Sequence, residues 1–205
     1  MDKKCCIVAA GPSELYITED SFIIAADAGL KKLNEKGIKA DLVIGDFDSG
    51  EEPIGENVIK FPVEKDDTDT LLALKEGIKA GYDTFYISGG MGGKLDHTVA
   101  NLQALAYAAE NGVRAYLVGN GQCAFVTDIG ACFKAKKEGR FSAFAFGGDA
   151  ENVKISGLKY ESGGVTLKSS FPLGVSNAFI GNESSVTLEK GKLLIIFDGT
   201  PDDVK

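Results

Sequence analysis

The chain has 205 residues, a formal net charge of −8, four cysteines and one histidine. This length allows a substantial core, in one large domain or two small ones. The excess of acids disfavours a nucleic-acid partner, because contacts to a phosphate backbone need Lys and Arg. No run approaches a membrane span of about 18 apolar residues, and the N-terminus lacks a signal peptide's long apolar core. We therefore expect a cytoplasmic protein without a membrane partner.

Histidine and cysteine chemistry is restricted in this sequence. The four cysteines include no C-x-x-C pair, which disfavours a zinc site. Cys5 and Cys6 fall in the first apolar run and are interpreted as small buried hydrophobic residues. Any Ser-His-Asp or Cys-His catalysis would have to use His97, the only histidine.

Residues 1–121 alternate between apolar strand patterns and helical patterns. Strands are predicted at residues 5–10, 22–26, 42–44, 58–61, 84–88 and 114–118, and helices at residues 30–36, 69–80 and 96–111. Such alternation predicts an α/β domain with a mostly parallel sheet, flanking helices and right-handed crossovers.

Residues 122–205 contain short β-rich runs separated by glycine and polar residues, with no helical pattern of useful length. The runs are residues 123–127, 141–146, 153–155, 165–167, 175–179, 186–188 and 193–197. This pattern predicts an antiparallel sandwich or barrel. We place a domain boundary near residue 121. The second domain, 122–205, is small enough to gain from packing on something else.

Two carboxylates follow the predicted strand at residues 42–44. If the backbone stays extended past Gly45, Asp46 and Asp48 share one face and Phe47 points the opposite way. Like charges this close repel unless one is protonated or a cation lies between them, and Mg²⁺ prefers oxygen ligands. Ligand sites of open α/β sheets lie beyond the carboxyl ends of the strands, where this pair falls. The alternative is a polar turn chosen for turn chemistry alone.

A second acidic cluster, residues 65–70, opens the helix predicted from residue 69. Asp66 or Asp67 as the N-cap, with Asp69 in the first turn, agrees with capping and helix-dipole preferences. Capping explains one or two of these acids but not all three. Because a helix N-terminus also binds phosphate, a metal and a nucleotide could meet here.

The glycine-rich run at residues 89–94 fits neither standard phosphate-binding pattern. A Walker A loop would need glycine at Ser88 and Ser or Thr at Leu95. The dinucleotide fingerprint would need its third glycine at Leu95. Both a tight strand-to-helix turn and close approach of a ligand to the backbone remain open.

Four polar residues near strand and helix ends complete the candidates from the residues themselves. Lys94 is available for an anionic oxygen, and Asp96 is expected at the helix cap. His97 could contact phosphate or cap the helix, and the sequence favours capping. Asp27, at another strand end, is either a turn residue or part of the same site.

Several segments in order along the chain resemble the thiamine pyrophosphokinase (thiamine diphosphokinase) family. They are Ala26–Gly29, Gly45–Ser49, Lys65–Asp69, Gly89–His97, Gly157–Tyr160 and Val175–Asn177, and together they span nearly the whole chain. The resemblance implies transfer of the diphosphoryl group of ATP to the thiamine hydroxyl, with Mg²⁺ as the metal and AMP as a product. It implies an α/β nucleotide-binding catalytic domain, 1–121, and a β-sandwich, 122–205, for thiamine binding and dimerisation. It also implies a homodimer with active sites shared between subunits.

The resemblance assigns roles where this sequence matches the family's motifs. Asp46, Asp48 and Asp69 match acids that hold metal and triphosphate, and Asp96 lines the same cleft, so all four are catalytic candidates. The residues assigned to ATP are Asp27, Gly29, Lys65, Gly92, Gly93, Lys94 and His97. The residues assigned to thiamine are Tyr160, which would stack on it, and Ser176 with Asn177. Nothing in the sequence decides whether Asp96 or Asp69 accepts the hydroxyl proton.

Two departures from the family's pattern affect these assignments. Lys94 stands where arginine is common and offers a point charge in place of a bidentate fork. Tyr160 stands where some members have tryptophan, which stacks with a larger area.

Two alternative functions remain open from the sequence. The Asp46-Phe47-Asp48 segment also resembles the Asp-x-Asp of haloacid-dehalogenase-like phosphatases, although there the pair follows the first strand of the core and not the third. A non-catalytic nucleotide or thiamine sensor on the same scaffold is the other. The number of carboxylates argues against a sensor, because binding a triphosphate does not need so many.

Overall fold

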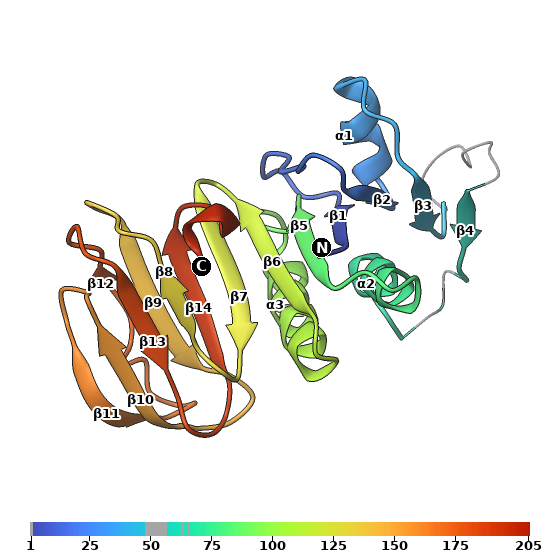
Figure 1. Cartoon of the computed structure of the whole chain (residues 1–205). Helices are drawn as coiled ribbons and strands as arrows, with labels where there is room; N and C mark the ends of the chain where they lie inside the picture. The colour runs from blue at the N-terminus through green and yellow to red at the C-terminus, as the bar shows by residue number, and fades with distance from the viewer. Residues whose placement is uncertain (1, 48–56, 63, 65) are drawn as a thin grey trace. The chain divides into compact units, whose positions relative to one another are not determined.

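The computed structural model describes residues 2–47, 57–62, 64 and 66–205 (Figure 1). The chain forms two compact units, Met1–Asn120 and Gly121–Lys205. We call them unit 1 and unit 2 and describe each by itself.

Unit 1 contains a parallel sheet with strand order β6-β5-β1-β2-β3-β4. The strands are β1 (Lys4–Val8), β2 (Phe22–Ala26), β3 (Leu42–Gly45), β4 (Val58–Lys60), β5 (Thr84–Ser88) and β6 (Arg114–Gly119). Three helices, α1 (Gly29–Glu35), α2 (Asp69–Lys79) and α3 (Leu95–Glu110), lie between them in the chain. The chain runs outward from β1 through β2, β3 and β4, then returns to place β5 on the other side of β1. This reversal of strand order is the kind of switch point where open α/β sheets bind ligands.

The start of α2 differs from the prediction. Thr68, and neither Asp66 nor Asp67, is the N-cap: its hydroxyl oxygen accepts a hydrogen bond of 3.2 Å from the Leu71 amide. The Asp67 carboxylate instead pairs with the Lys75 ammonium at 2.6 Å. Threonine is an effective cap residue, so capping does not require any of the three acids here. Asp69 lies in the first turn, as predicted.

Unit 2 is built from two antiparallel sheets, which confirms the predicted fold class. One has the order β12-β9-β14-β7 and the other β11-β10-β13-β8. The strands are β7 (Gln122–Thr127), β8 (Ala131–Phe133), β9 (Arg140–Ala145), β10 (Ala150–Ser156), β11 (Ser162–Leu167), β12 (Asn177–Ala178), β13 (Ser184–Thr187) and β14 (Leu193–Asp198), followed by a short 3-10 turn, Pro201–Asp203.

A cluster of phenylalanines joins these two sheets. The Phe133 ring of β8 lies 5.5 Å from the Phe141 ring of β9 and 5.2 Å from the Phe197 ring of β14, centroid to centroid. Both pairs have the edge-to-face geometry that aromatic quadrupoles favour. Strand β8, which carries the central ring, was not among the predicted strands. Its three residues are too few to show an alternating pattern.

Two further sequence interpretations bear on the fold. Cys5 and Cys6 are fully buried, as interpreted, and burial raises the pKa of the Cys5 thiol, so it stays protonated at neutral pH. In the described part of the chain, every helix is too short or too polar to cross a membrane.

Candidate functional site

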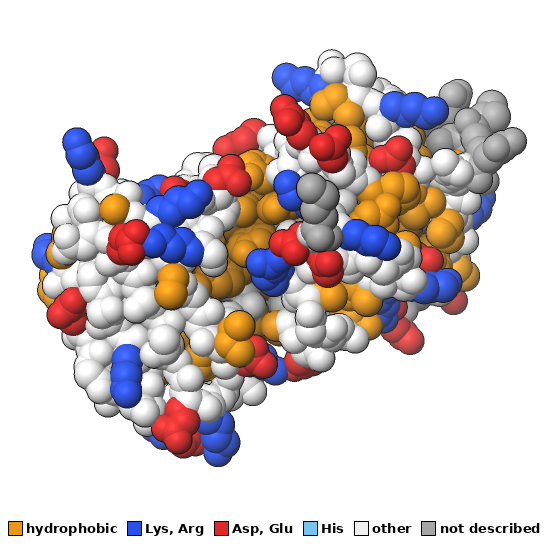
Figure 2. Space-filling model, viewed as in Figure 1, with side chains coloured by type: hydrophobic (Ala, Val, Ile, Leu, Met, Phe, Trp, Pro, Cys, Tyr) orange, Lys and Arg blue, Asp and Glu red, His pale blue; other side chains and the backbone are white. Residues whose placement is uncertain are grey.

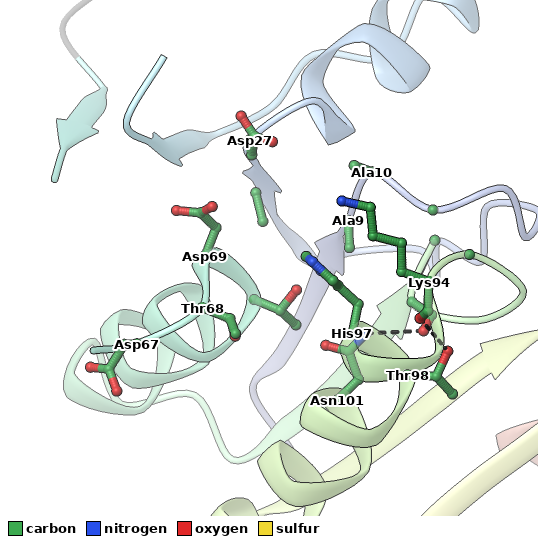
Figure 3. Close-up of a pocket in the computed structure, with 16 residues that line it drawn as sticks. Ala9, Ala10, Asp27, Asp67, Thr68, Asp69, Lys94, His97, Thr98 and Asn101 are labelled. Carbon is green, nitrogen blue, oxygen red and sulfur yellow. Dashed lines mark hydrogen bonds between the residues drawn. The ribbon is translucent and has the colours of Figure 1, made fainter. Parts of the chain in front are cut away.

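A cavity of about 560 Å³ lies at the carboxyl ends of the central strands of unit 1 (Figure 3). Its walls are residues 9–11 after β1, 26–27 at the end of β2, 89–90 after β5, 67–70 at the start of α2, and 93–94, 97–98 and 101 at the start of α3. The cavity therefore lies at the switch point of the sheet. Two helices of 11 and 16 residues begin at its walls, and their first backbone N–H groups favour an anionic ligand.

The glycine-rich turn is shaped partly by packing. Gly89 has φ of +71°, and a Cβ there would overlap the Ala9 carbonyl oxygen. A Cβ on Gly90 would lie 2.6 Å from Leu117 Cδ1. Gly93 differs, because a Cβ there would meet Pro12 Cδ at an ordinary 3.4 Å. Gly93 also lines the cavity, so it is the glycine of this turn that packing does not explain.

Gly29 and Gly92, assigned to ATP by resemblance, are not among the residues lining the cavity. A Cβ on Gly29 would overlap the carbonyl oxygen of Val8, so α1 can begin against β1 only with glycine at this position. Gly92 has φ of +77°, a conformation that L side chains rarely adopt. Both glycines therefore have a structural reason to be present.

Two carboxylates from different elements face this cavity. Asp27 follows β2 and Asp69 opens α2, and Figure 3 shows both across the cavity from Lys94 and His97. The Asp27 amide donates to the Ile44 carbonyl of β3 at 2.7 Å, which fixes this residue beside the end of the neighbouring strand. Gly45, the last residue of β3, packs directly against Asp27, because a Cβ on Gly45 would lie only 3.3 Å from Asp27 Cα. Asp46, the next residue, is therefore close to Asp27 at the same sheet edge.

The backbone after β3 is not extended, so the predicted alternation of Asp46, Phe47 and Asp48 is wrong at its middle residue. Phe47 has φ of +55°, in the left-handed region. Its ring packs against the cluster that contains Val8 and Val43. Burying a phenylalanine gives about 1.5–3 kcal/mol, which offsets about 1–2 kcal/mol for a left-handed residue. Asp48 and Lys65 lie outside the described residues.

Magnesium suits the acids that face the cavity. The residues that the structure describes contain no group of three or more His, Cys, Asp or Glu side chains placed to hold a metal ion. Mg²⁺ in nucleotide sites is held by one or two carboxylates together with substrate phosphates and water. Asp27 and Asp69 provide two oxygen donors at one cavity, which fits that mode of binding.

The start of α3 separates three candidates that the sequence placed together. Lys94 is the N-cap residue, and α3 has no side-chain capping hydrogen bond, so the prediction that Asp96 caps the helix is wrong. Asp96 is exposed, accepts a 2.9 Å hydrogen bond from the His97 amide and is not among the residues lining the cavity. His97 lines the cavity with Lys94, in place of the favoured capping role.

Two residues beside the cavity were missed by sequence reasoning. Asn101 is 6% exposed, and its amide donates to the Gly90 carbonyl oxygen at 2.9 Å. A polar residue on the buried face of an alanine-rich helix was a signal that could have identified it. Lys32 of α1 donates to the carbonyl oxygens of Gly11 and Ser13. One lysine in a short helix gives no comparable signal.

In unit 2, the residues assigned to thiamine form one connected group. The Tyr160 side chain is 59% exposed, and the Lys159 ammonium lies 5.3 Å from the centre of its ring. Asn177 is buried: its Oδ1 accepts from the Tyr160 amide at 2.9 Å, and its Nδ2 donates to the Tyr160 carbonyl oxygen at 2.7 Å. Ser176 is exposed with φ of +62°. Asn177 therefore positions Tyr160, while Tyr160 and Ser176 are accessible to a ligand.

These observations define a class first: an α/β unit with a cavity lined by two helix N-termini at its sheet switch point, followed in the chain by a β-sandwich with an exposed aromatic residue. Two family profiles match the chain, "Thiamin pyrophosphokinase, catalytic domain" over residues 13–117 and "Thiamin pyrophosphokinase, vitamin B1 binding domain" over residues 133–193. The chain belongs to the thiamin pyrophosphokinase family and is a diphosphotransferase of the kinase type.

Individual relatives agree over nearly full length. The thiamine pyrophosphokinase of Bacillus subtilis (strain 168) is 28% identical, over 93% of this chain and 96% of the relative. A crystal structure of thiamine pyrophosphokinase from Bacillus subtilis superposes with a TM-score of 0.84 at 25% identity, covering 96% of this chain and 99% of that one. The Geobacillus thermodenitrificans enzyme superposes at 0.81 with 22% identity, covering 98% and 99%, and supports the fold alone. None of these matches favours the phosphatase or sensor alternatives.

Proposed function

We propose that the chain uses ATP and Mg²⁺ to convert thiamine to thiamine diphosphate. The observation that carries this proposal is the cavity of unit 1, which brings two helix N-termini and Lys94 together with Asp27 and Asp69. A polyphosphate needs this combination: N–H groups and a cation for its oxygens, and carboxylates for its metal. Mg²⁺ held by Asp27 and Asp69, with Asp46 at the same edge, would neutralise charge on the phosphates.

In the proposed reaction, the thiamine hydroxyl oxygen attacks the β-phosphorus of ATP. The bond between that phosphorus and the oxygen bridging it to the α-phosphate breaks, and AMP leaves. The protein acts mainly by positioning the reactants and stabilising charge, as in other phosphoryl transfers. A carboxylate accepts the hydroxyl proton. Asp69 is the better candidate than Asp96 for this role, because Asp69 lines the cavity and Asp96 does not.

Product analysis tests the reaction directly. The protein is incubated with ATP, Mg²⁺ and thiamine, and AMP, ADP and thiamine diphosphate are quantified. We expect AMP and thiamine diphosphate in equal amounts, and no AMP without thiamine. Formation of ADP would contradict diphosphoryl transfer. Release of inorganic phosphate from a phosphate ester without ATP would indicate a phosphatase, and binding without turnover would indicate a sensor.

We also propose a homodimer in which unit 2 of one subunit supplies the thiamine contacts for unit 1 of the other. Unit 2 exposes several large apolar side chains, and exposed apolar surface of this kind can mark an interaction site. They are Tyr160, Phe171, Leu173, Val175 and Ile180, between 49% and 62% exposed. The resemblance to the family supports the same assembly. A closed pairing of two copies would cover such a segment on each subunit.

Two predictions from composition stay predictions: a cytoplasmic location and the absence of a nucleic-acid partner. On the face drawn in Figure 2, acidic and basic side chains are interspersed and do not form a basic stripe. This distribution is consistent with a small anionic substrate that reaches a local site.

Gly93→Ala tests whether nucleotide approaches the backbone of the glycine-rich turn. The protein has room for the methyl group, so we expect an unchanged Tm. If a phosphate binds against the backbone of Gly93, the methyl group would occupy part of its space. ATP should then bind about tenfold more weakly, a loss of about 1.4 kcal/mol of binding free energy. Calorimetric titration with MgATP measures this. Gly90→Ala, which collides with Leu117, is the matched control and should lower Tm. Unchanged ATP affinity in Gly93→Ala would exclude close approach at this residue.

Asn177→Asp tests whether the hydrogen bonds of Asn177 hold Tyr160 in position for thiamine. The carboxylate cannot donate to the Tyr160 carbonyl oxygen, and in this buried position the lost bond should cost about 1–3 kcal/mol of folding free energy. We expect a lower Tm and a raised KM for thiamine, with the KM for ATP unchanged. Asn182→Asp, an exposed change of the same type in unit 2, is the control. If the KM for thiamine in folded Asn177→Asp equals that of the unmodified protein, Tyr160 does not contact thiamine from this position.

A further inference from the structure

The Lys32 ammonium is directed into the protein beside the cavity. It donates hydrogen bonds to two backbone carbonyl oxygens of the loop that follows β1, those of Gly11 and, at 2.8 Å, Ser13. Burial lowers the pKa of Lys32, and the charges of Glu14 and Glu35 act in the opposite direction without offsetting it. A lysine that served only the dipole of α1 would gain from its position in the last turn without its ammonium being held by two backbone carbonyl oxygens.

The loop that Lys32 holds forms part of the cavity wall. Gly11 lines the cavity, and a Cβ there would overlap the Gly89 carbonyl oxygen. The buried Ser13 accepts a hydrogen bond from the Met91 amide at 3.4 Å. A Cβ on Gly89 would lie 3.2 Å from Lys32 Nζ. Lys32 therefore lies where the loop after β1 and the glycine-rich turn after β5 meet.

We propose that Lys32 is a positioning residue for the anionic substrate: it holds the loop after β1 against the glycine-rich turn, so that both present their backbone to the phosphates. The inference rests on the proposed use of ATP. The ammonium does not line the cavity itself, so it acts through the two loops and through its charge. That charge adds to the charge of Lys94, the one lysine among the lining residues that the structure describes.

The test compares Lys32→Met with Lys31→Met. Lys31 is the neighbouring, exposed lysine of α1, so its variant loses the same charge from the same helix without breaking the contacts to Gly11 and Ser13. MgATP is titrated into each folded protein without thiamine, thiamine is titrated separately, and Tm is measured. We expect Lys32→Met to bind ATP about tenfold more weakly, because the loop after β1 is no longer held against the glycine-rich turn, with thiamine affinity unchanged. Lys31→Met should match the unmodified protein in all three measurements.

The outcomes separate this inference from the proposed function. If the unmodified protein does not bind MgATP, the proposed function fails before Lys32 is tested. If it binds and folded Lys32→Met binds within twofold of it, the positioning role is overturned, even where Tm is lower. If Lys32→Met does not fold, Lys32→Leu replaces it, because leucine also removes both hydrogen bonds to the loop. Unchanged ATP affinity in folded Lys32→Leu would also overturn the inference.

Discussion

Asp69→Asn is expected to lower kcat by about a thousandfold, as loss of one strong electrostatic contact to a transition state does, while the protein stays folded. The variant keeps the shape of the side chain and removes its charge from the cavity, where the proposed metal and the thiamine hydroxyl proton both need it. Thr68 still caps α2, so the helix keeps its cap, and the loss of the Asp69 charge from the first turn should cost about 0.3–1 kcal/mol of dipole interaction. Steady-state kinetics and a thermal melt without Mg²⁺ measure the two effects.

Glu76→Gln is the control for Asp69→Asn. It removes the same charge from the same helix, at a residue whose carboxylate pairs with the Lys79 ammonium at the surface, at 3.5 Å. Exposed pairs of this kind contribute about 0–1 kcal/mol, so activity and Tm should hardly change. Normal turnover by Asp69→Asn would remove Asp69 from the reaction. Unfolding of that variant would assign it a structural role.

Activity recovered by mixing two inactive variants is the second expected result. One partner is Asp69→Asn, defective in unit 1; the other is Tyr160→Ala with Ser176→Gly, defective in unit 2. Glycine is chosen at 176 because it adopts the observed left-handed conformation without strain. If sites are shared across a two-fold dimer, random exchange makes half the dimers mixed and about a quarter of all sites intact. Diphosphoryl transfer should then return to about a quarter of the unmodified level.

The control for subunit exchange is mixing each variant with itself under the same conditions, which should give no recovery. Size-exclusion chromatography of differently tagged subunits confirms that mixed dimers form. Should mixed dimers form and remain inactive, each subunit builds its own site, and the proposed sharing is wrong.

The pattern of apolar residues in the sequence predicted the larger elements of the fold. Residues 22–26 and 84–88 were predicted with the observed bounds, because buried strands of a parallel sheet are continuous apolar runs. Strand β8 carries the central ring of the unit 2 core but is too short to show a period. The N-cap of α2 was misplaced because Asp66, Asp67 and Thr68 are all good caps, and sequence alone does not rank them.

The sequence predicts which segments of the chain meet at the site. It does not predict which side chains of those segments line the cavity. Strand and helix ends at one sheet edge were the reason to consider Asp27 and Asp69 together, and both residues line one cavity. Lys94 and Asp96 are two residues apart at the start of α3, yet of these two only Lys94 lines the cavity. Phe47 shows the same limit, since its left-handed backbone depends on packing of its ring against distant residues.

The left-handed conformations at Asp27, Phe47 and Ser176 have a consequence for engineering heat resistance. Each non-glycine residue in this conformation costs about 1–2 kcal/mol, against a typical domain stability of about 5–15 kcal/mol. A screen that selects only for survival at high temperature would therefore favour glycine at Asp27 and Ser176. Both replacements would remove a polar group from the proposed binding surfaces. The variants with the highest thermal stability should therefore be among those with the lowest catalytic activity.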